Sequence, residues 1–284
     1  MLSKLFVIAS SLLNTPLRAI FKLSNRDIFN KYDIQKYIII PEKMQECQSY
    51  DPFLRIPEYY FKDFHAYTGG NLNRDAAQEA VAATYAVMDH HYTDMGGKEC
   101  SDYIRESFGD MCLRHLRYNP LNVIDLGCGA GVSTYHLQNL YPGAKILGID
   151  LSPFFLDVTR SFKFFDKTTF VHGSAENLGV PNCSQDVISA SYLFHELPME
   201  SSIEIIKEAY RALKVGGMLT ILDMNPYMKA SNPMMKCIFH QTEPYLDEYR
   251  NLIQRMTGIV GEIGFEFVGN VSYSKTFMII LIKN

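Results

Sequence analysis

Residues 123–131 read Val-Ile-Asp-Leu-Gly-Cys-Gly-Ala-Gly, an apolar run that passes directly into a glycine-rich loop. Glycine tolerates positive φ and carries no side chain, so such a loop lets a ligand approach the backbone where the next helix begins. The spacing is Gly-x-Gly-x-Gly, whereas a dinucleotide fingerprint would need a glycine at the position of Val132. The stretch predicts a strand, a cofactor-binding turn and a helix, and it weakens a dehydrogenase interpretation.

Beyond this loop, β-branched and apolar runs alternate with helical patterns, which is typical of a parallel sheet covered by helices. The sequence predicts strands near 121–126, 145–150, 168–172, 186–191 and 217–223, and helices near 131–140, 153–162 and 199–213. After a helix near 244–262, the strands Phe265–Val271 and Ser274–Ile282 are joined by too few residues for a helical crossover, so they must pair antiparallel. The predicted fold is α/β and Rossmann-like, with a seven-stranded, mostly parallel sheet and a reversed last strand.

We expect three parts: an N-terminal segment over 1–26, a helical cap over 27–120 and a catalytic domain over 121–284. Residues 1–26 carry four basic side chains and no acid, so the rest of the chain sums to −8 within a net charge of −4. The apolar stretch from Leu5 to Leu13 is too short to span a bilayer. The segment is interpreted either as an amphipathic helix, packed on the domain or lying on a membrane surface, or as a transit peptide.

The composition limits the function classes. A net charge of −4 gives no global reason to bind a phosphate backbone, so nucleic acid is not an expected partner. Six scattered cysteines without a Cys-x-x-Cys pair indicate reduced thiols in an intracellular protein, either soluble or peripherally bound to a membrane. No zinc site or other metal site is expected.

Asp150 ends the second predicted strand, nineteen residues after Gly131. A carboxylate there, next to Leu151, can accept hydrogen bonds from both ribose hydroxyls of a cofactor, although capping of the next helix would use the same geometry. After the third strand, Ser174 and the backbone of Ala175 are expected to contact an adenine.

The fourth predicted strand ends at Ser191 and continues into Tyr192 and then the run Phe-His-Glu-Leu-Pro. In an open α/β sheet, ligands bind in the crevice beyond the strand ends. Ser191 and Tyr192 are predicted to contact the cofactor, although an aromatic ring there could equally be a core residue. His195 is a candidate general base because its ordinary pKa is near neutrality, and Glu196 is a second candidate; either could instead cap the loop or the next helix.

Together these segments resemble class I S-adenosylmethionine (SAM)-dependent methyltransferases of the ubiquinone/menaquinone-biosynthesis type, across about 123–282. The resemblance implies that SAM is the cofactor, with its methionine end on the glycine loop and its ribose on Asp150. The implied contacts are Asp125, Gly127, Cys128, Gly129, Gly131 and Asp150. Many members have an acid at the position of Ser174, so the chain departs from the pattern there.

A narrower resemblance rests on residues 194–198, 223–226 and 242–245, which read Phe-His-Glu-Leu-Pro, Asp-Met-Asn-Pro and Thr-Glu-Pro-Tyr. They are similar to a group of such enzymes from photosynthetic organisms, often predicted plastid proteins. This favours the transit-peptide interpretation of residues 1–26, in which case the protein is expected in an organelle, a plastid or a mitochondrion. It also suggests that Tyr67, a third catalytic candidate, belongs to a lid over the cofactor, with loop packing as the alternative.

SAM carries an activated methyl group, so the protein need only align a nucleophile, exclude water and, where required, remove a proton. The expected acceptor is a small apolar or amphipathic molecule, methylated on carbon or oxygen, because the insertion 227–249 contains Met234, Met235, Phe239 and His240. One alternative is a SAM-binding regulatory or assembly protein without catalysis. Another is a protein or RNA methyltransferase, although the Asn/Asp-Pro-Pro-Tyr/Phe signature is missing after the fourth strand.

Overall fold

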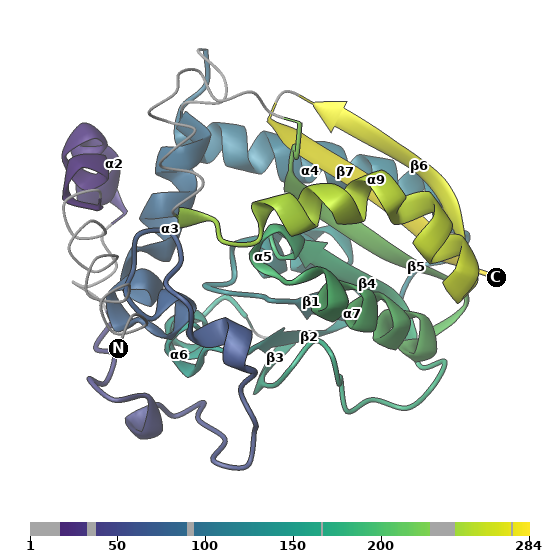
Figure 1. Ribbon diagram of the computed structural model, residues 1–284, viewed down its shortest axis with the longest axis horizontal. Helices are drawn as coiled ribbons and strands as arrows, with labels where there is room; N and C mark the ends of the chain where they lie inside the picture. Colours follow the sequence, from purple (N-terminus) through teal and green to yellow (C-terminus); the bar gives the residue numbers. More distant parts are fainter. Residues whose placement is uncertain (1–17, 33–37, 90–93, 166, 228–241, 274) are drawn as a thin grey trace.

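Seven strands form one sheet in the computed structural model, which describes residues 18–32, 38–89, 94–165, 167–227, 242–273 and 275–284 (Figure 1). The strands are β1 (Asn122–Leu126), β2 (Lys145–Asp150), β3 (Thr168–His172), β4 (Gln185–Ser191), β5 (Leu213–Met224), β6 (Phe265–Tyr273) and β7 (Thr276–Lys283). Their order in the sheet is β3-β2-β1-β4-β5-β7-β6. β1 to β5 pair parallel, whereas β7 is antiparallel to both β5 and β6. The predicted fold, including the reversed last strand, is confirmed.

The α-helices among the described residues include α2 (Arg26–Lys31), α3 (Arg74–Asp89), α4 (Gly97–His115), α5 (Val132–Leu140), α6 (Pro153–Ser161), α7 (Met199–Ala212) and α9 (Leu246–Ile263). The four that follow residue 120 lie close to their predicted positions. Short 3₁₀ turns include η3 (Glu58–Phe61), η4 (Gly70–Leu72) and η5 (Phe194–Glu196). α6 begins where proline follows the capping residue Ser152, whose hydroxyl accepts from the amide of Phe155.

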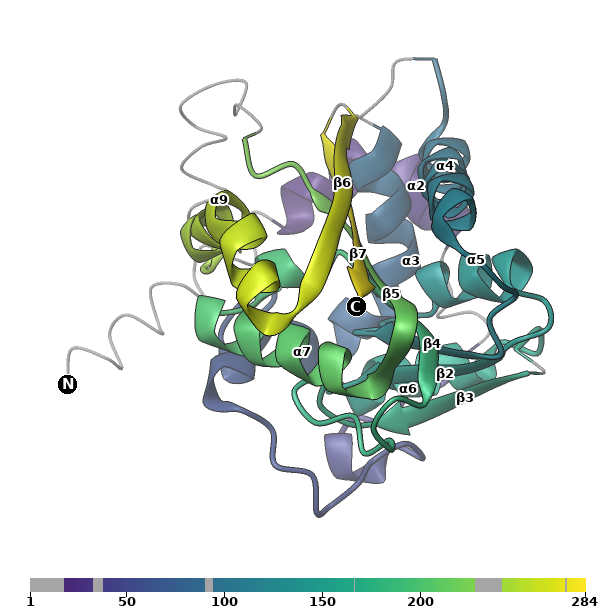
Figure 2. The ribbon, with the colours of Figure 1, turned by 90° about the vertical axis from the view of Figure 1, so that its right-hand side faces the viewer.

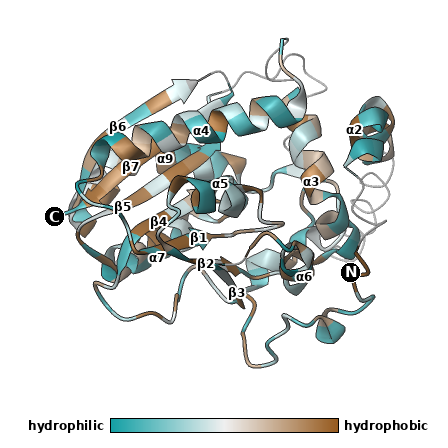
Figure 3. Cartoon of the chain, turned by 180° about the vertical axis from the view of Figure 1, so that it is seen from behind, coloured by the Kyte–Doolittle hydropathy of each residue, from teal (hydrophilic) through white to brown (hydrophobic). Residues whose placement is uncertain are grey.

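Helices α7 and α9 cover one face of the sheet, as Figure 2 shows. The apolar residues of α7 that enter the core recur at helical spacing: Ile205, Ile206, Ala209 and Ala212. They pack with strand residues such as Ile188 and Leu219, which are fully buried. The sheet strands appear in Figure 3 as mainly hydrophobic segments between more polar helices. Because the faces of the sheet are covered by apolar packing, polar site residues are expected at the ends of the strands.

Helices α4 and α5 cover the opposite face (Figure 2). α4 presents a stripe with a spacing of four residues, Cys100, Ile104, Phe108 and Cys112, to the sheet. α4 therefore belongs to the layer that covers the sheet, although it lies within the range predicted as a cap. The division at residue 120 stays a prediction.

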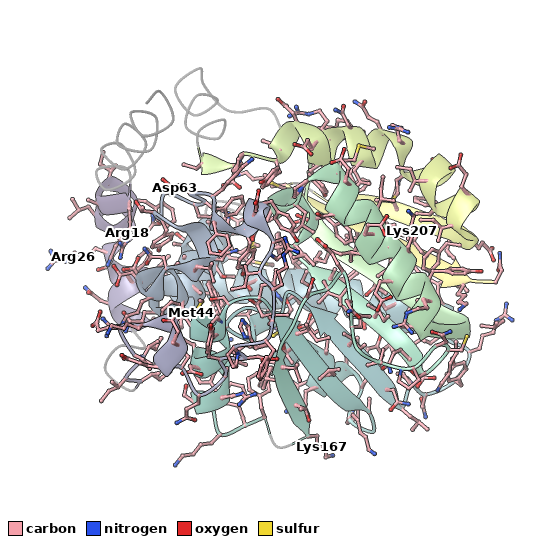
Figure 4. The ribbon with its side chains drawn as sticks, turned by 60° about the horizontal axis from the view of Figure 1, so that its bottom comes forward. Arg18, Arg26, Met44, Asp63, Lys167 and Lys207 are labelled. Atoms are coloured by element: carbon pink, nitrogen blue, oxygen red, sulfur yellow. The ribbon has the colours of Figure 1, made fainter. Side chains whose placement is uncertain are left out.

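Two basic residues of the N-terminal segment, Arg18 and Lys22, contact α3. Arg18 and Lys22 both pair with the buried carboxylate of Glu79, at 2.6 Å and 2.7 Å from its Oε1. In Figure 4, Arg18 lies on the side of the molecule away from Lys207 of α7. The stretch from Leu5 to Leu13 lies outside the described residues.

Among the described residues, no helix is both long and apolar enough to cross a membrane.

Candidate active site

The loop after β1 has the backbone conformation that its glycines permit. Gly129 and Gly131 have φ values of +52° and +81°. A Cβ at Gly131 would lie 2.8 Å from Cγ2 of Thr159, so packing against α6 requires glycine there. A Cβ at Gly129 would meet no atom nearer than 3.7 Å, on Phe155. Phe155 is thus in ordinary van der Waals contact with that position, and both polar groups of the Gly129 backbone are bonded within the protein: its amide donates to Asp150 and its carbonyl oxygen accepts from the Thr159 hydroxyl at 2.7 Å.

Asp150 connects this loop to the end of β2. Its Oδ2 accepts from the amide of Gly129 at 2.8 Å, and its Oδ1 accepts from the amide of Ser152 at 2.8 Å. The hydroxyl of Tyr60 in η3 donates to Oδ1 at 3.3 Å. Burial raises the pKa of Asp150, and these hydrogen bonds oppose the shift. The carboxylate thus sits where the sequence predicts it, with η3 closing over it.

Asp125 lies at the base of the same loop and is 1% exposed. Its Oδ2 accepts from the Thr134 hydroxyl at 2.5 Å, whereas its Oδ1 is buried and has no hydrogen-bond partner among the described residues. Burial raises the pKa of this carboxyl to about 7. Because a buried acceptor without a partner is costly, this oxygen fits a donor from a bound ligand, such as the ammonium group of SAM.

Cys128 and Leu151, the neighbouring residues predicted to bind the cofactor, make their polar contacts within the protein through the backbone. The amide of Cys128 donates to the carbonyl of Ile149 at 3.0 Å, and burial raises the pKa of its thiol, so no reactive thiolate faces the loop. Leu151 is buried, and its carbonyl oxygen lies 3.0 Å from Nε2 of His172.

Ser174 and Ala175 lie in the loop after β3. The hydroxyl of Ser174 accepts from the amide of Glu176 at 3.1 Å, and Ala175 packs against the main core. Glu176 in turn accepts from the hydroxyl of Tyr59 at 2.7 Å, so η3 is tied to this loop as well. Adenine binding there stays a prediction.

Ser191 and Tyr192 lie on the α4 side of the sheet. The Tyr192 ring has the guanidinium of Arg105, from α4, 5.5 Å from its centroid. Ser191 borders a cavity of about 360 Å³ between α4, α5 and the sheet. Their contact with the cofactor stays a prediction.

A second polar group lies beyond the ends of β4 and β5, and we call it the histidine–glutamate cluster: His65, His195, Glu196 and Glu243. Nδ1 of His65 lies 3.9 Å from Oε1 of Glu196, and Nε2 of His65 lies 3.3 Å from Oε1 of Glu243. Nε2 of His195 lies 4.0 Å from Oε1 of Glu196. Two imidazoles and two carboxylates from three remote segments therefore share one space.

Asp223, at the end of β5, orients His195. Its Oδ1 lies 2.7 Å from Nδ1 of His195, and its Oδ2 accepts from the amide of Phe194 at 2.9 Å. Burial alone would lower the pKa of His195, but Asp223 and then Glu196 raise it to about 9. Burial also raises the pKa of Glu196, which accepts from the Asn71 side chain at 2.6 Å.

The structure brings two of the three catalytic candidates together. His195 and Glu196 share the cluster, whereas the hydroxyl of Tyr67 donates to Glu79 at 2.7 Å, beside Arg18. A catalytic role for Tyr67 stays a prediction. The residues that the sequence did not select as site residues are Tyr60, His65, Asn71, Asp223 and Glu243. Some of them lie in the stretches that carry the narrower resemblance, but no spacing in the sequence connects them.

A family of proteins described as "Methyltransferase domain" matches residues 123–217, from β1 into β5. Fold, loop and family match define the class: this part of the chain is a class I SAM-dependent methyltransferase domain, as the resemblance implied, and its cofactor is S-adenosylmethionine.

Among curated proteins, the chain is 32% identical over 143 residues to an uncharacterised methyltransferase of Synechocystis, covering 50% of this chain and 62% of that protein. It is 29% identical over 145 residues to the demethylmenaquinone methyltransferase of Chlorobaculum parvum, covering 51% and 54%. It is 31% identical over 152 residues to the malonyl-[acyl-carrier protein] O-methyltransferase of Hahella chejuensis, covering 52% and 51%. The matches thus span between about half and three fifths of these relatives. Synechocystis and Chlorobaculum are photosynthetic, which fits the narrower resemblance in part.

A solved structure supports the fold over a larger part of the chain. A proposed SAM-dependent methyltransferase of Methanococcus maripaludis superposes with a TM-score of 0.54 at 16% identity, covering 75% of this chain and 94% of that one.

Proposed function

We propose that this protein transfers the methyl group of SAM to a small molecule in the crevice beyond the carboxyl ends of β1, β2 and β4. The observation that carries the proposal is the buried Oδ1 atom of Asp125 at the base of the glycine loop, which has no hydrogen-bond partner among the described residues. The ammonium group of SAM would pair with Asp125, and its ribose hydroxyls would bond Asp150. When bound, SAM supplies an activated methyl group on a sulfonium.

Asn71 supports the placement of the acceptor next to this cofactor site. Its carbonyl oxygen accepts from the hydroxyl of Ser152, which adjoins the Asp150 loop, at 2.7 Å. Its side chain donates to Glu196 of the histidine–glutamate cluster at 2.6 Å. A single residue thus spans from the ribose end of the cofactor site to the cluster, so an acceptor held there is adjacent to SAM.

The surroundings of the cluster favour an amphipathic acceptor. Phe64 is buried, and the centroid of its ring lies 6.1 Å from that of His195; the Tyr249 ring lies 6.4 Å from His195 on another side. Polar groups between aromatic rings suit a molecule with one oxygen-bearing end and an apolar body. Two of the relatives are named for demethylmenaquinone and for malonyl-[acyl-carrier protein]. The insertion residues Met234, Met235, Phe239 and His240 lie outside the described residues.

Methylation of a hydroxyl or an acidic carbon requires removal of a proton, and the cluster is the part of the site equipped for it. Because Asp223 holds Nδ1 of His195, the Nε2 atom is the one directed to Glu196 and to an acceptor. His195 therefore remains our candidate base, and Glu196 the second; because the pKa of His195 is raised to about 9, its base form is populated mainly above that pH.

The test is the fate of the methyl group. The protein is incubated with methyl-labelled SAM and a metabolite extract. Two quantities are then measured: the S-adenosylhomocysteine formed, and the label transferred to other molecules. We expect equal amounts of S-adenosylhomocysteine and of label in small molecules. SAM binding without any S-adenosylhomocysteine would favour the regulatory alternative, and label in protein or RNA would overturn the choice of acceptor.

A further inference from the structure

Three side chains of the histidine–glutamate cluster are arranged as ligands of a metal ion. One ligand atom each from His65, His195 and Glu196 lies within 4.8 Å of the others. Atoms that bind one ion at about 2.0–2.2 Å lie about 3–4 Å apart, so small side-chain movements would complete the site. We propose that these residues bind one divalent transition-metal ion, which holds an oxygen atom of the methyl acceptor.

The residues around His195 support this proposal. A histidine that ligates a metal commonly donates its other ring N–H to a carboxylate, which fixes the orientation of the ring. Asp223 lies 2.7 Å from Nδ1 of His195, is fully buried, and so leaves Nε2 for the metal. Asn71 fixes Glu196 in the same way, because it donates to Oε2 and leaves Oε1 toward both imidazoles.

Glu243 provides independent evidence for a missing cationic partner. Its side chain is 7% exposed, and its Oε1 is 3.3 Å from Nε2 of His65. Its Oε2 is buried without a hydrogen-bond partner among the described residues. An unpaired carboxylate oxygen in a buried site is costly. Glu243 can satisfy it as a fourth ligand or by accepting a hydrogen bond from a water molecule on the metal.

The ligand set indicates the kind of ion. Magnesium and calcium prefer oxygen ligands only, whereas imidazole suits zinc, iron, nickel and copper. Methyl transfer needs no redox change at the metal, and two histidines with one glutamate form a zinc site with an open position. We therefore expect Zn²⁺. His65 has 43% of its side chain exposed, so the site can be reached from solvent.

The inference rests on the proposed function, since it gives the cluster the task of binding the acceptor. It also changes the role of His195, because an Nε2 atom that ligates a metal cannot take up a proton. A metal ligand and a general base are alternatives for this atom, and they can be distinguished by experiment.

The experiment uses the full chain after removal of metal with a chelator. Co²⁺ is titrated as a spectroscopic substitute for Zn²⁺, and Zn²⁺ is then added in competition. We expect one ion per chain, visible Co²⁺ bands typical of mixed nitrogen and oxygen ligands, and loss of the bands on addition of Zn²⁺. Glu196→Gln and His65→Ala should each weaken binding at least tenfold, and Asp223→Asn about 10–100-fold.

His115→Ala is the matched control, because His115 is an exposed histidine at the end of α4. It should bind the ion as the wild type does. SAM titration of each variant reports that the fold and the cofactor site are intact, and Glu196→Gln serves if His65→Ala does not fold. Absence of stoichiometric binding, or equal binding by Glu196→Gln and wild type, would overturn the metal site. Methyl transfer by the metal-free chain would overturn the metal site and leave the proposed function standing. A metal-loaded chain that transfers no methyl group would contradict the proposed function alone.

Discussion

The amide of Gly129 donates to Oδ2 of Asp150 at 2.8 Å, across 21 positions of the chain. The bond fixes the loop after β1 against the carboxyl end of β2, the two places where we propose that SAM binds. The other carboxylate oxygen, Oδ1, accepts from the amide of Ser152 and from the hydroxyl of Tyr60, so both oxygens of Asp150 are bonded within the protein. The geometry of this pair underlies the predictions on SAM binding.

SAM affinity should rise with pH between about 5.5 and 7. Burial raises the pKa of Asp125 to about 7, from an ordinary value of 3.8, so the empty site is largely protonated below that pH. The ammonium group of SAM prefers the carboxylate form, and the gain should approach tenfold per pH unit well below the pKa. Calorimetric titration at several pH values checks this. Asp125→Asn should bind SAM weakly with a flatter pH dependence, and an unchanged pH slope in this variant would contradict the assignment.

The same carboxyl affects the stability of the protein without cofactor in the opposite direction. Because the pKa of Asp125 is higher in the folded than in the unfolded chain, its contribution to stability is fully present at pH values below the unfolded-state pKa. This contribution is lost as the pH rises through about 7. The free energy of unfolding of the wild type relative to Asp125→Asn should therefore fall between pH 4 and pH 7. Denaturant titrations of both proteins measure the difference.

Two glycine substitutions should separate packing from ligand access. Gly131→Ala should lower stability more, because its Cβ would meet Thr159 at 2.8 Å as well as adopt a positive φ. A Cβ at Gly129 would make only an ordinary contact, 3.7 Å from Phe155, so for Gly129→Ala we expect a loss of about 1–2 kcal/mol from the positive φ and a large loss of SAM affinity. Thermal unfolding and SAM titration provide the two readouts. Normal SAM affinity in Gly129→Ala would show that the ligand does not approach there.

Glu79→Gln should weaken the attachment of residues 18–26 to α3. Glu79 is buried and pairs with Arg18 and Lys22, so we expect a loss of about 1.5–3 kcal/mol in the free energy of unfolding. Asp75→Asn is the control, since Asp75 contacts the same arginine at 3.0 Å but is 46% exposed and should cost less than about 1 kcal/mol.

The pKa of Glu79 gives this prediction a pH dependence. Although burial opposes it, hydrogen bonds from Arg18 and Lys22 lower the pKa of Glu79. The stabilisation is therefore present above the ordinary pKa and lost as the pH falls through the lowered value. The difference between wild type and Glu79→Gln should shrink under acid conditions, and a constant difference would argue against an ionic contact.

The fold was predictable because its signals are local. An apolar run, a glycine loop and a helical pattern recur within short windows, and the final pair of strands is too close in sequence for a parallel crossover. The start of β5 was harder to predict: the sequence pattern predicts residue 217, but the strand begins at Leu213. Pairing of Leu213 with Gln185 of β4 decides that boundary, and the local sequence pattern does not show it.

The candidate site was predictable only on the strands and in the segments that directly follow them. Asp150 ends a strand at a fixed distance from the glycine loop, so pattern alone selected it. His65 and Glu243 come from loops 178 positions apart, and the hydrogen bond from the amide of His65 to the carbonyl of Thr242 brings them together. Such loop pairing depends on the whole fold, so no local pattern in the sequence indicates that these residues belong to one cluster.

The central claim, that the loop after β1 and Asp150 form the SAM site, is tested most directly by calorimetric titration of SAM into wild type and Asp150→Asn. Asp157→Asn is the control, because Asp157 also accepts from two backbone amides, of Gln48 and Ser49, but lies on α6. We predict that Asp150→Asn binds SAM at least tenfold more weakly, since bonds to a charged acceptor contribute about 1.5–3 kcal/mol each, while Asp157→Asn binds as the wild type does. Equal affinity of Asp150→Asn and wild type would contradict the account.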